Sequence, residues 1–275
     1  MSDLAGRTII MSGGSRGIGL AIALRAARDG ANIALLAKTA QPHPRLQGTI
    51  YSAAEEIEAA GGRALAIVGD VRDDVAVADA VERTFERFGG IDVVVNNASA
   101  IDVSPSATIA MKRYDLMQDV NARGTFLLSR TCVPYLREAE NPHVLTLSPP
   151  LSLDPKWYGS HLAYTLAKFG MSMCTVGMAR EHADAGIAFN SLWPRTIIAT
   201  AAVQNLLGGD AAMARSRRPE IVADAAHHIL TRPARTTTGN FFIDDEVLAD
   251  AGVTDLNGYA YVADADLQVD LFLDG

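Results

Sequence analysis

The feature that most constrains the fold is a glycine-rich segment between a strand-like run and a helix-like run. Residues 7–11 form a short apolar run, and residues 17–29 are rich in Ala, Leu and Ile. Between them, Gly13, Gly17 and Gly19 follow a G-x-x-x-G-x-G spacing. Glycines let the main chain turn sharply and approach a pyrophosphate, and the free amides at a helix start favour negative charge. An ordinary glycine-rich turn is the alternative, but the position in a β-turn-α unit favours a phosphate site.

The same alternation of strand and helix continues along the chain. Strands alternating with helices at short spacing indicate right-handed crossovers and a mainly parallel sheet covered on both faces. The sequence therefore predicts an α/β, Rossmann-type doubly wound fold of about seven strands. Further strands are expected at 32–36, 64–68, 91–95, 143–147, 187–192 and 239–243, and helices at 50–60, 73–88, 112–120, 124–136 and 160–184, with irregular stretches at 38–49 and 148–159.

We expect residues 1–275 to form a single domain, because no repeat, low-complexity tract or linker interrupts this series. Residues 244–275 would be a C-terminal extension. Its mixture of Asp, Glu and Gly with Leu, Val and Tyr leaves two placements open. The extension could lie over the active site or join a subunit contact.

Composition excludes several classes of partner. The net charge is -8 and the sequence pI is near 5.2, so the surface repels nucleic-acid phosphates and anionic lipid heads. Cys132 and Cys174 have no C-x-x-C or Cys/His spacing, which favours reduced core thiols over metal ligands or a disulfide. No signal-peptide pattern is visible, and no apolar run approaches the roughly 20 residues that span a bilayer. The expected protein is soluble and cytoplasmic.

Charge at the end of the second predicted strand favours NADP(H) over NAD(H). An NAD site usually has Asp or Glu there to hold the ribose hydroxyls, whereas a 2′-phosphate requires cations. Here the strand runs into Ala37 and Lys38, and Arg16 in the glycine turn supplies a second cation. The alternative is that both are solvated surface charges.

Tyr164 and Lys168 are four residues apart on the predicted helix 160–184, so they stand on one face. A phenol titrates near pH 10, and a neighbouring ammonium favours the phenolate. Tyr164 could then exchange a proton with a substrate oxygen while hydride moves at carbon. Such a pair also occurs by chance on many helices, where the tyrosine is a half-buried anchor.

Taken together, these motifs resemble those of the short-chain dehydrogenase/reductase family over nearly the whole chain. The resemblance rests on the glycine turn, residues 96–99 (Asn-Asn-Ala-Ser), Asn121, and the Tyr164-Thr-Leu-Ala-Lys168 motif. Residues 37–44, 147–151 and 192–194 are similar to the catalytic domain of the hydroxysteroid dehydrogenase-like protein 2 group within that family.

The resemblance implies roles for individual residues. Tyr164 would be the general acid/base, and Lys168 would hold the nicotinamide ribose as well as tune Tyr164. Asn121 would position a water in a proton relay. Residues 194–200 would form the wall beside the nicotinamide and the hinge of a substrate loop. The implied cofactor-binding residues are Gly13, Ser15, Arg16, Gly17, Ile18, Gly19, Lys38, Asp70, Val71, Asn97, Ala98, Tyr164, Lys168, Pro194, Thr196 and Ile197.

Within that set, Gly13 to Gly19 and Lys38 would contact the NADP phosphates, Asp70 the adenine and Asn97 the ribose side. Structural roles are the alternatives: Asp70 could cap a helix, Asn97 and Asn121 could satisfy main-chain groups, and Pro194 could end a strand. The resemblance also implies a homodimer or homotetramer, with contacts through residues 112–136 and 160–184.

The sequence departs from the family pattern at the catalytic serine. The family places a serine about 13 residues before the tyrosine, where its hydroxyl polarises the substrate oxygen. Here that spacing gives Leu151, and counting from the preceding strand gives Pro149. We take Ser148 as the replacement, with Ser152 as the alternative. A milder departure is Ser12, where the family prefers threonine, because a hydroxyl remains.

The sequence thus predicts an NADP(H)-dependent enzyme that transfers hydride to or from a carbonyl or alcohol of a fairly apolar substrate. The substrate preference rests on Leu151, Trp157 and Trp193 in loops expected around the cleft. The alternative is a cofactor-binding regulatory or lipid-handling protein whose chemistry is weakened by the displaced serine.

Overall fold

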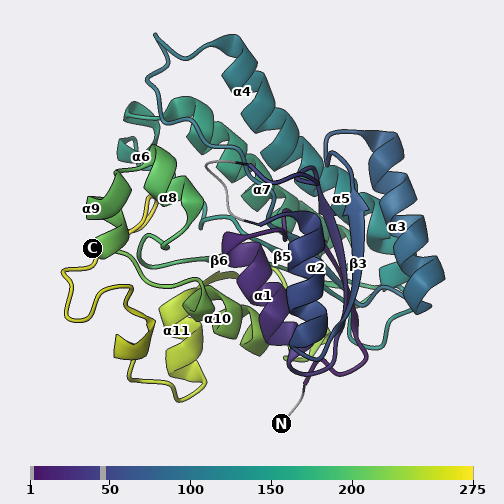
Figure 1. Cartoon of the computed structure of the whole chain (residues 1–275). Helices are drawn as coiled ribbons and strands as arrows, with labels where there is room; N and C mark the ends of the chain where they lie inside the picture. Colours follow the sequence, from purple (N-terminus) through teal and green to yellow (C-terminus); the bar gives the residue numbers. More distant parts are fainter. Residues whose placement is uncertain (1–2, 44–47, 275) are drawn as a thin grey trace.

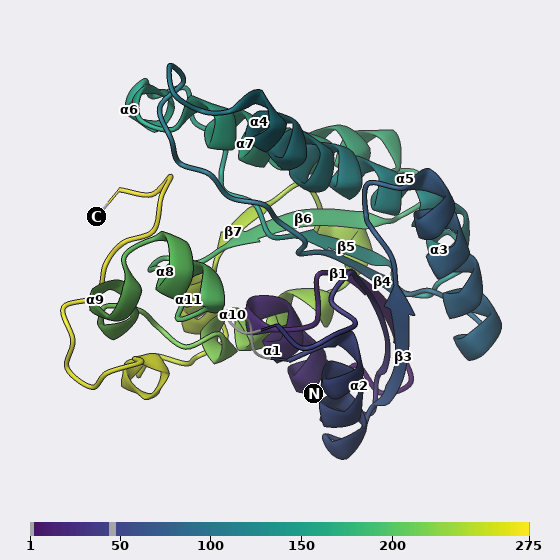
Figure 2. The ribbon, with the colours of Figure 1, turned by 45° about the horizontal axis from the view of Figure 1, so that its top comes forward.

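The computed structural model describes residues 3–43 and 48–274, so Pro44 of the sequence motif at 37–44 lies outside the described residues. Its centre is one seven-stranded sheet in the order β3-β2-β1-β4-β5-β6-β7 (Figures 1 and 2). Every neighbouring pair of strands is parallel. The strands are β1 (Thr8–Ser12), β2 (Asn32–Ala37), β3 (Arg63–Val68), β4 (Val93–Asn96), β5 (His143–Thr146), β6 (Ala188–Trp193) and β7 (Phe241–Ile243).

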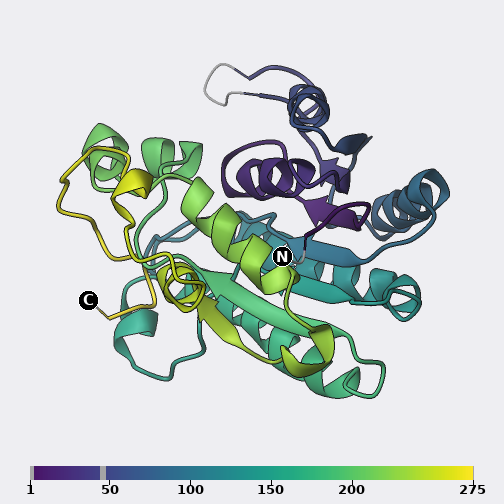
Figure 3. The same cartoon turned by 90° about the horizontal axis from the view of Figure 1, so that it is seen from below.

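Helices cover both faces of the sheet (Figure 2). One face packs against α1 (Gly17–Ala27), α2 (Ile50–Ala59), α10 (Glu220–Leu230) and α11 (Asp244–Asp250). On this face α10 lies beside α1 (Figure 3). The other face packs against α3 (Asp74–Phe88), α5 (Gly124–Leu136) and α7 (Leu162–Glu181). Because both faces are covered, β1 and β2 are buried at every residue, which explains their continuous apolar sequences.

Local signals define the ends of several helices. Thr49 and Ser52 form a reciprocal capping box at the start of α2. The carboxylate of Asp73 accepts hydrogen bonds from the amides of Val75 and Ala76 at the start of α3. Gly89 ends α3 in the left-handed conformation, at φ 85°.

The predicted fold class is confirmed, and the structure corrects several details. The predicted helix at 160–184 begins at Leu162, and the stretch expected to be irregular contains the short helix α6 (Lys156–Gly159). A π-helical turn, η1 (Gln118–Arg123), joins α4 (Met111–Met117) directly to α5, where two separate helices were expected. Besides α6, four α-helices of the described residues had no predicted counterpart: α8 (Ala201–Leu206), α9 (Gly209–Ala214), α10 and α11.

The segment after α11 returns to the carboxyl edge of the sheet. After the short 3₁₀ turn η3 (Asn257–Tyr259), Val269 forms an antiparallel bridge with Thr196 beyond the end of β6. Near the C-terminus, Asp274 pairs with Lys156 of α6. Within the described ranges, no helix has both the length and the apolarity needed to cross a membrane.

Candidate active site

The sequence-predicted residues converge at the carboxyl edge of the sheet, where the strand order reverses between β1 and β4. Open parallel sheets bind ligands at such a switch point, because the connections on its two sides leave in opposite directions. Ser12 ends β1, Asn96 ends β4, and the glycine turn leads from β1 into α1. The structure thus places the predicted phosphate turn at the position where this architecture binds ligands.

The glycine turn is clamped to the end of β4 by a set of short contacts. The hydroxyl of Ser12 accepts hydrogen bonds from the amides of Asn97 and Ala98, both at 3.2 Å. The side-chain amide of Asn97 donates to the carbonyl of Gly13 at 2.8 Å. A Cβ on Gly19 would lie 2.5 Å from Asn97 Nδ2, and one on Gly13 would lie 2.8 Å from Ala98 Cα. Both positions therefore require glycine, and the side chain of Asn97 satisfies a main-chain group.

The first turn of α1 can accept an anion. No side chain of the described chain caps this turn, and it holds no acidic residue. Its leading amides therefore remain available for an oxyanion. Arg16 precedes the helix, and its guanidinium donates to the carbonyl of Gly48 at 2.9 Å. Ser15 is buried within the turn, whereas Ile18 and Gly17 are half-buried.

A cluster of charges lies where β2 and β3 end. Lys38 Nζ lies 3.2 Å from Asp70 Oδ2, and Arg72 makes hydrogen bonds of 2.6–3.0 Å with the same carboxylate. The contacts from Arg72 hold the pKa of Asp70 far below its usual value. Two cations share one carboxylate, so the cluster keeps a net positive charge. The ammonium group of Lys38, with 58% of its side chain exposed, can reach a ligand.

Sequence reasoning missed Arg72, although its position two residues after Asp70 was a usable signal. Asp70 does not cap α3, because Asp73 does. Its neighbour Val71 is buried in the core beneath the charge cluster.

Tyr164 and Lys168 lie on α7 as the sequence predicted, and both are sealed from water. Tyr164 is 5% exposed and Lys168 is 3% exposed. Lys168 Nζ donates to the carbonyl of Leu147 at 2.8 Å and lies 5.1 Å from the ring centroid of Trp193. Burial raises the pKa of Tyr164 and lowers the pKa of Lys168 to about 7. The pair therefore stands in a low-dielectric site in which proton transfers are sensitive to neighbouring charge.

Asn121 lies in the π-helical turn η1 and is fully buried. Its side-chain oxygen accepts from the amide of Ala100 at 2.7 Å, and its side-chain nitrogen donates to the carbonyl of Ala100 at 3.0 Å. Both polar groups are thus committed to the loop after β4. A contact between Asn121 and a water would have to come from its main chain.

The placement of Ser148 does not fit the catalytic role expected for it. Its Oγ lies 2.9 Å from Ser191 Oγ, and the residue is completely buried. Ser191 Oγ also lies 2.9 Å from Thr175 Oγ1, so Ser148 belongs to a hydroxyl network inside the core. The alternative, Ser152, accepts from the amide of Asp154 at 3.2 Å in the turn before α6. Pro149 is buried and its carbonyl accepts from Ser172 at 2.6 Å.

The segment after β6 carries an unsatisfied polar group. The hydroxyl oxygen of Thr196 is buried and has no hydrogen-bond partner among the described residues. Such a group fits a ligand that brings its own donor or acceptor. Pro194 directly follows β6, and the amide of Ile197 donates to the carbonyl of Gln268 at 3.0 Å.

The C-terminal segment lies over the candidate site. This is one of the two placements that the sequence left open for it. The ring of Phe272 lies 6.1 Å from the ring of Tyr164, centroid to centroid. Asp270 is half-buried, and desolvation raises its pKa to about 7 while the charge of Lys168 opposes this rise. Residues of this segment were not among the predicted site residues, because no local motif marks them.

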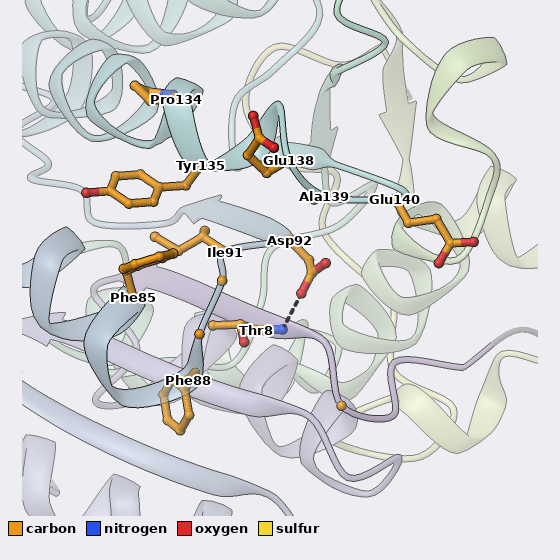
Figure 4. A pocket seen from close by; sticks show the side chains of 13 residues that line it. Thr8, Phe85, Phe88, Ile91, Asp92, Pro134, Tyr135, Glu138, Ala139 and Glu140 are labelled. Carbon is orange, nitrogen blue, oxygen red and sulfur yellow. Dashed lines mark hydrogen bonds between the residues drawn. The ribbon is translucent and has the colours of Figure 1, made fainter.

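Among the described residues, two further cavities lie away from Tyr164 and Lys168. One of about 220 Å³ lies between the loop after β4 and the end of α8, lined by Ile101, Asp102, Val103, Ser104, Arg113, Leu206 and Leu207. The other, of about 630 Å³, lies at the amino ends of the strands and is lined by groups such as Asp92, Phe85 and Tyr135 (Figure 4). It is at the edge opposite the glycine turn, so it is separate from the candidate active site.

Comparison with known families and proteins gives consistent results. The profile of the family described as "short chain dehydrogenase" matches residues 7–209. The chain is 53% identical to hydroxysteroid dehydrogenase-like protein 2 of Danio rerio over 272 residues, which cover 99% of this chain and 65% of that protein. It is 52% identical to the Homo sapiens protein of the same name over 271 residues, covering 98% and 64%. The chain spans about two thirds or less of the length of these curated relatives.

Solved structures of dehydrogenases are also similar to this chain. A putative dehydrogenase from Xanthomonas campestris superimposes with a TM-score of 0.96 at 56% identity, covering 99% of this chain and all of that one. A short chain dehydrogenase from Mycobacterium thermoresistibile gives a TM-score of 0.94 at 57% identity, with coverage of 99% and 96%. Carveol dehydrogenase from Mycobacterium avium, in complex with NAD, shares the fold at 21% identity, with a TM-score of 0.75 and coverage of 88% and 96%. The resemblance of the sequence motifs to this family and group is confirmed.

Proposed function

The chain belongs to the short-chain dehydrogenase family, and from this premise we propose that it is an NADP(H)-dependent oxidoreductase. It would transfer hydride between the cofactor and a carbonyl or alcohol group of a fairly apolar substrate. The observation that carries this proposal is the sealed pair of Tyr164 and Lys168 on α7, with Lys168 anchored to the carbonyl of Leu147. Two ionisable side chains that are buried on neighbouring turns of one helix, with strongly shifted pKa values, are candidates for proton transfer.

Each side chain has a defined task in the reaction. The bound nicotinamide supplies or accepts the hydride. In the reductive direction, the neutral phenol of Tyr164 gives its proton to the substrate oxygen. In the oxidative direction, the ammonium form of Lys168 stabilises the phenolate that takes the proton back. Asn121, through its main chain, would hold a water that returns the proton to solvent.

The charges around the glycine turn support NADP(H) as the cofactor. The free amides of the first turn of α1 would hold the pyrophosphate, and Arg16, Lys38 and Arg72 would surround the 2′-phosphate. Asp70 balances only part of the positive charge of Lys38 and Arg72, so a phosphate would gain more from this site than a ribose hydroxyl would. Asp70 positions Lys38 and Arg72, and the unpartnered hydroxyl of Thr196 suits the carboxamide end of the cofactor.

We propose that no serine hydroxyl assists Tyr164, because Ser148 is committed to the core. This departure supports a second candidate function, a cofactor-binding protein with little turnover. The two candidates differ in one observable: both bind NADPH, but only the first oxidises it with a carbonyl compound.

The same proposal includes a homodimer or homotetramer in the cytoplasm. Large apolar side chains stand exposed on the helices expected to form contacts, among them Phe126 on α5 and Leu166 and Met173 on α7. Burying such a stripe against a second copy would remove it from water. Molar mass by light scattering at micromolar concentration tests this, and a monomer would contradict it. The free cysteines Cys132 and Cys174 agree with a reducing compartment.

The test of the proposed reaction is NADPH oxidation with a panel of aldehydes and ketones. Replacing Tyr164→Phe should lower kcat at least about 100-fold, as expected when a general acid is lost. The matched control is Tyr51→Phe, which removes an exposed hydroxyl on α2 and should leave kcat unchanged. If the panel gives no oxidation while NADPH binds, the second candidate function holds. If Tyr164→Phe keeps the wild-type rate, the assignment of Tyr164 is wrong.

A further inference from the structure

Phe272, near the end of the chain, fills an aromatic chamber against the catalytic tyrosine. It is 4% exposed, although it lies in a segment without regular secondary structure. Its ring makes tilted or edge-on contacts on several sides, with centroid distances of 5.3–6.1 Å. The chamber consists of Trp157, His161, Tyr164, Phe169 and Trp193.

The segment that carries Phe272 is held mainly through its main chain. The amide of Asp270 donates to the carbonyl of Arg195 at 3.0 Å, and the carbonyl of Leu271 accepts from the indole of Trp193 at 2.8 Å. Beyond Phe272, Asp274 pairs with Lys156 at the surface. Phe272 itself has a φ of 73°, in the left-handed region that side chains other than glycine rarely adopt. This conformation is strained, so less free energy is needed to release the ring.

The position of Phe272 conflicts with substrate binding. A carbonyl oxygen must come within hydrogen-bond distance of the phenol of Tyr164 for proton transfer. With Phe272 packed against its ring, Tyr164 is almost inaccessible. The catalytic chamber therefore holds a ring of this chain in the place where the body of a substrate has to lie.

We propose that the Phe272 chamber is the subsite for the apolar body of the substrate, and that the substrate is a carbonyl or alcohol compound that carries a ring. The inference rests on the proposed function and names its substrate class. Aromatic walls arranged edge-on and tilted around a phenyl group match a ring better than a linear chain, because a ring contacts several faces at once with little conformational entropy to lose. The substrate displaces Phe272 and exposes Tyr164 as it enters.

Tryptophan fluorescence can test this without cofactor or turnover. The chain has two tryptophans, and both, Trp157 and Trp193, are ring neighbours of Phe272. Quenching by acrylamide therefore reports how open the subsite is. Phe272→Ala should raise the quenching constant at least about twofold over wild type, because the ring that shields both indoles is removed. The control Val262→Ala, at an exposed position in the same C-terminal region, should change nothing.

Two ketones with equal numbers of carbon atoms test the ring preference. In Phe272→Ala, 4-tert-butylcyclohexanone should shield the two indoles from acrylamide again. It should bind this variant at least about tenfold more tightly than it binds wild type, because in wild type Phe272 competes with it. Decan-2-one should protect the two indoles of Phe272→Ala from acrylamide at least about fivefold more weakly than the cyclic ketone does. Equal protection by both ketones, or no rise in quenching in Phe272→Ala, would overturn the inference.

Folding of the variants is checked by circular dichroism. If Phe272→Ala does not fold, Phe272→Leu allows the same comparison. Its acrylamide quenching constant should rise less, because leucine fills the chamber only in part. The readout uses neither NADPH nor hydride transfer. A chain that binds the cyclic ketone but never oxidises NADPH therefore refutes the proposed function alone, whereas a chain that turns over equally well with linear ketones and shows no ring preference refutes the subsite alone.

Discussion

The hydroxyl oxygens of Ser148 and Ser191 lie 2.9 Å apart in the buried core, and Ser191 continues this contact to Thr175 on α7. The two contacts tie the segment after β5 to β6 and α7. Ser148 therefore has a structural role in the core, two residues after the end of the strand from which a catalytic hydroxyl was expected.

Replacing Ser148→Ala should lower the free energy of unfolding by about 1 kcal/mol, the usual net worth of one buried hydrogen bond. It should change kcat by less than about threefold, because the hydroxyl contacts no reacting group. Urea unfolding and NADPH oxidation measure the two effects. A fall in kcat of about 100-fold with unchanged stability would return Ser148 to the catalytic machinery.

Replacing Gly19→Ala should disrupt the clamp between the glycine turn and β4. The added Cβ would lie 2.5 Å from Asn97 Nδ2 and 2.8 Å from the carbonyl oxygen of Gly13. We expect a loss of about 1–3 kcal/mol of stability from overpacking, together with weaker NADPH binding. Gly90→Ala is the control, because no atom lies within 4 Å of its added Cβ. Normal stability and NADPH binding in Gly19→Ala would show that the clamp is not needed.

Asp244 should make stability depend on pH in the direction opposite to most carboxylates. One of its oxygens accepts from the amides of Arg195 and Asp245, and the other has no partner among the described residues. Burial raises its pKa to about 6, whereas an unfolded Asp titrates near 3.9. The folded state therefore binds more protons between about pH 4 and pH 6, and stability is lost as the pH rises through this window.

Relative to wild type, Asp244→Asn should gain up to about 3 kcal/mol of stability between pH 4 and pH 7, because the neutral amide removes this loss. Urea unfolding at a series of pH values measures the difference. Asp250→Asn, on the same helix with a carboxylate side chain that is 73% exposed, is the matched control and should show no such trend. If the difference in unfolding free energy between Asp244→Asn and wild type does not change with pH, the raised pKa assigned to Asp244 is contradicted.

Much of the fold could be predicted because its strands are buried on both faces and read as apolar runs, as β1 and β2 do. Helices α8 and α9 have six residues each, too few for a clear 3.6-residue period. Helix α10 did carry a signal, since Ile221, Val222, Ala225 and Ile229 lie on a buried face. No helix was predicted there.

The candidate site also contains residues that the sequence could predict and residues that it could not. Tyr164, Lys168 and the glycine turn belong to local motifs, so their spacing was enough to find them. Phe272 and Asp270 enter the site only through contacts with residues distant along the chain, which no local pattern reveals. The side-chain direction of Ser148 depends on the path of the chain between the end of β5 and Pro149, and sequence counting could not resolve it.

Cofactor binding tests the central claim most directly. Fluorescence titration of wild type should show tighter binding of NADPH than of NADH, and Lys38→Asp should weaken NADPH at least about tenfold, a change of about 1.4 kcal/mol, with little effect on NADH. Arg83→Asp, a reversal of an exposed charge on α3, is the control and should bind both cofactors as wild type does. If neither cofactor binds wild type, or if Lys38→Asp leaves the preference for NADPH intact, the account of this site as an NADP(H) site is contradicted.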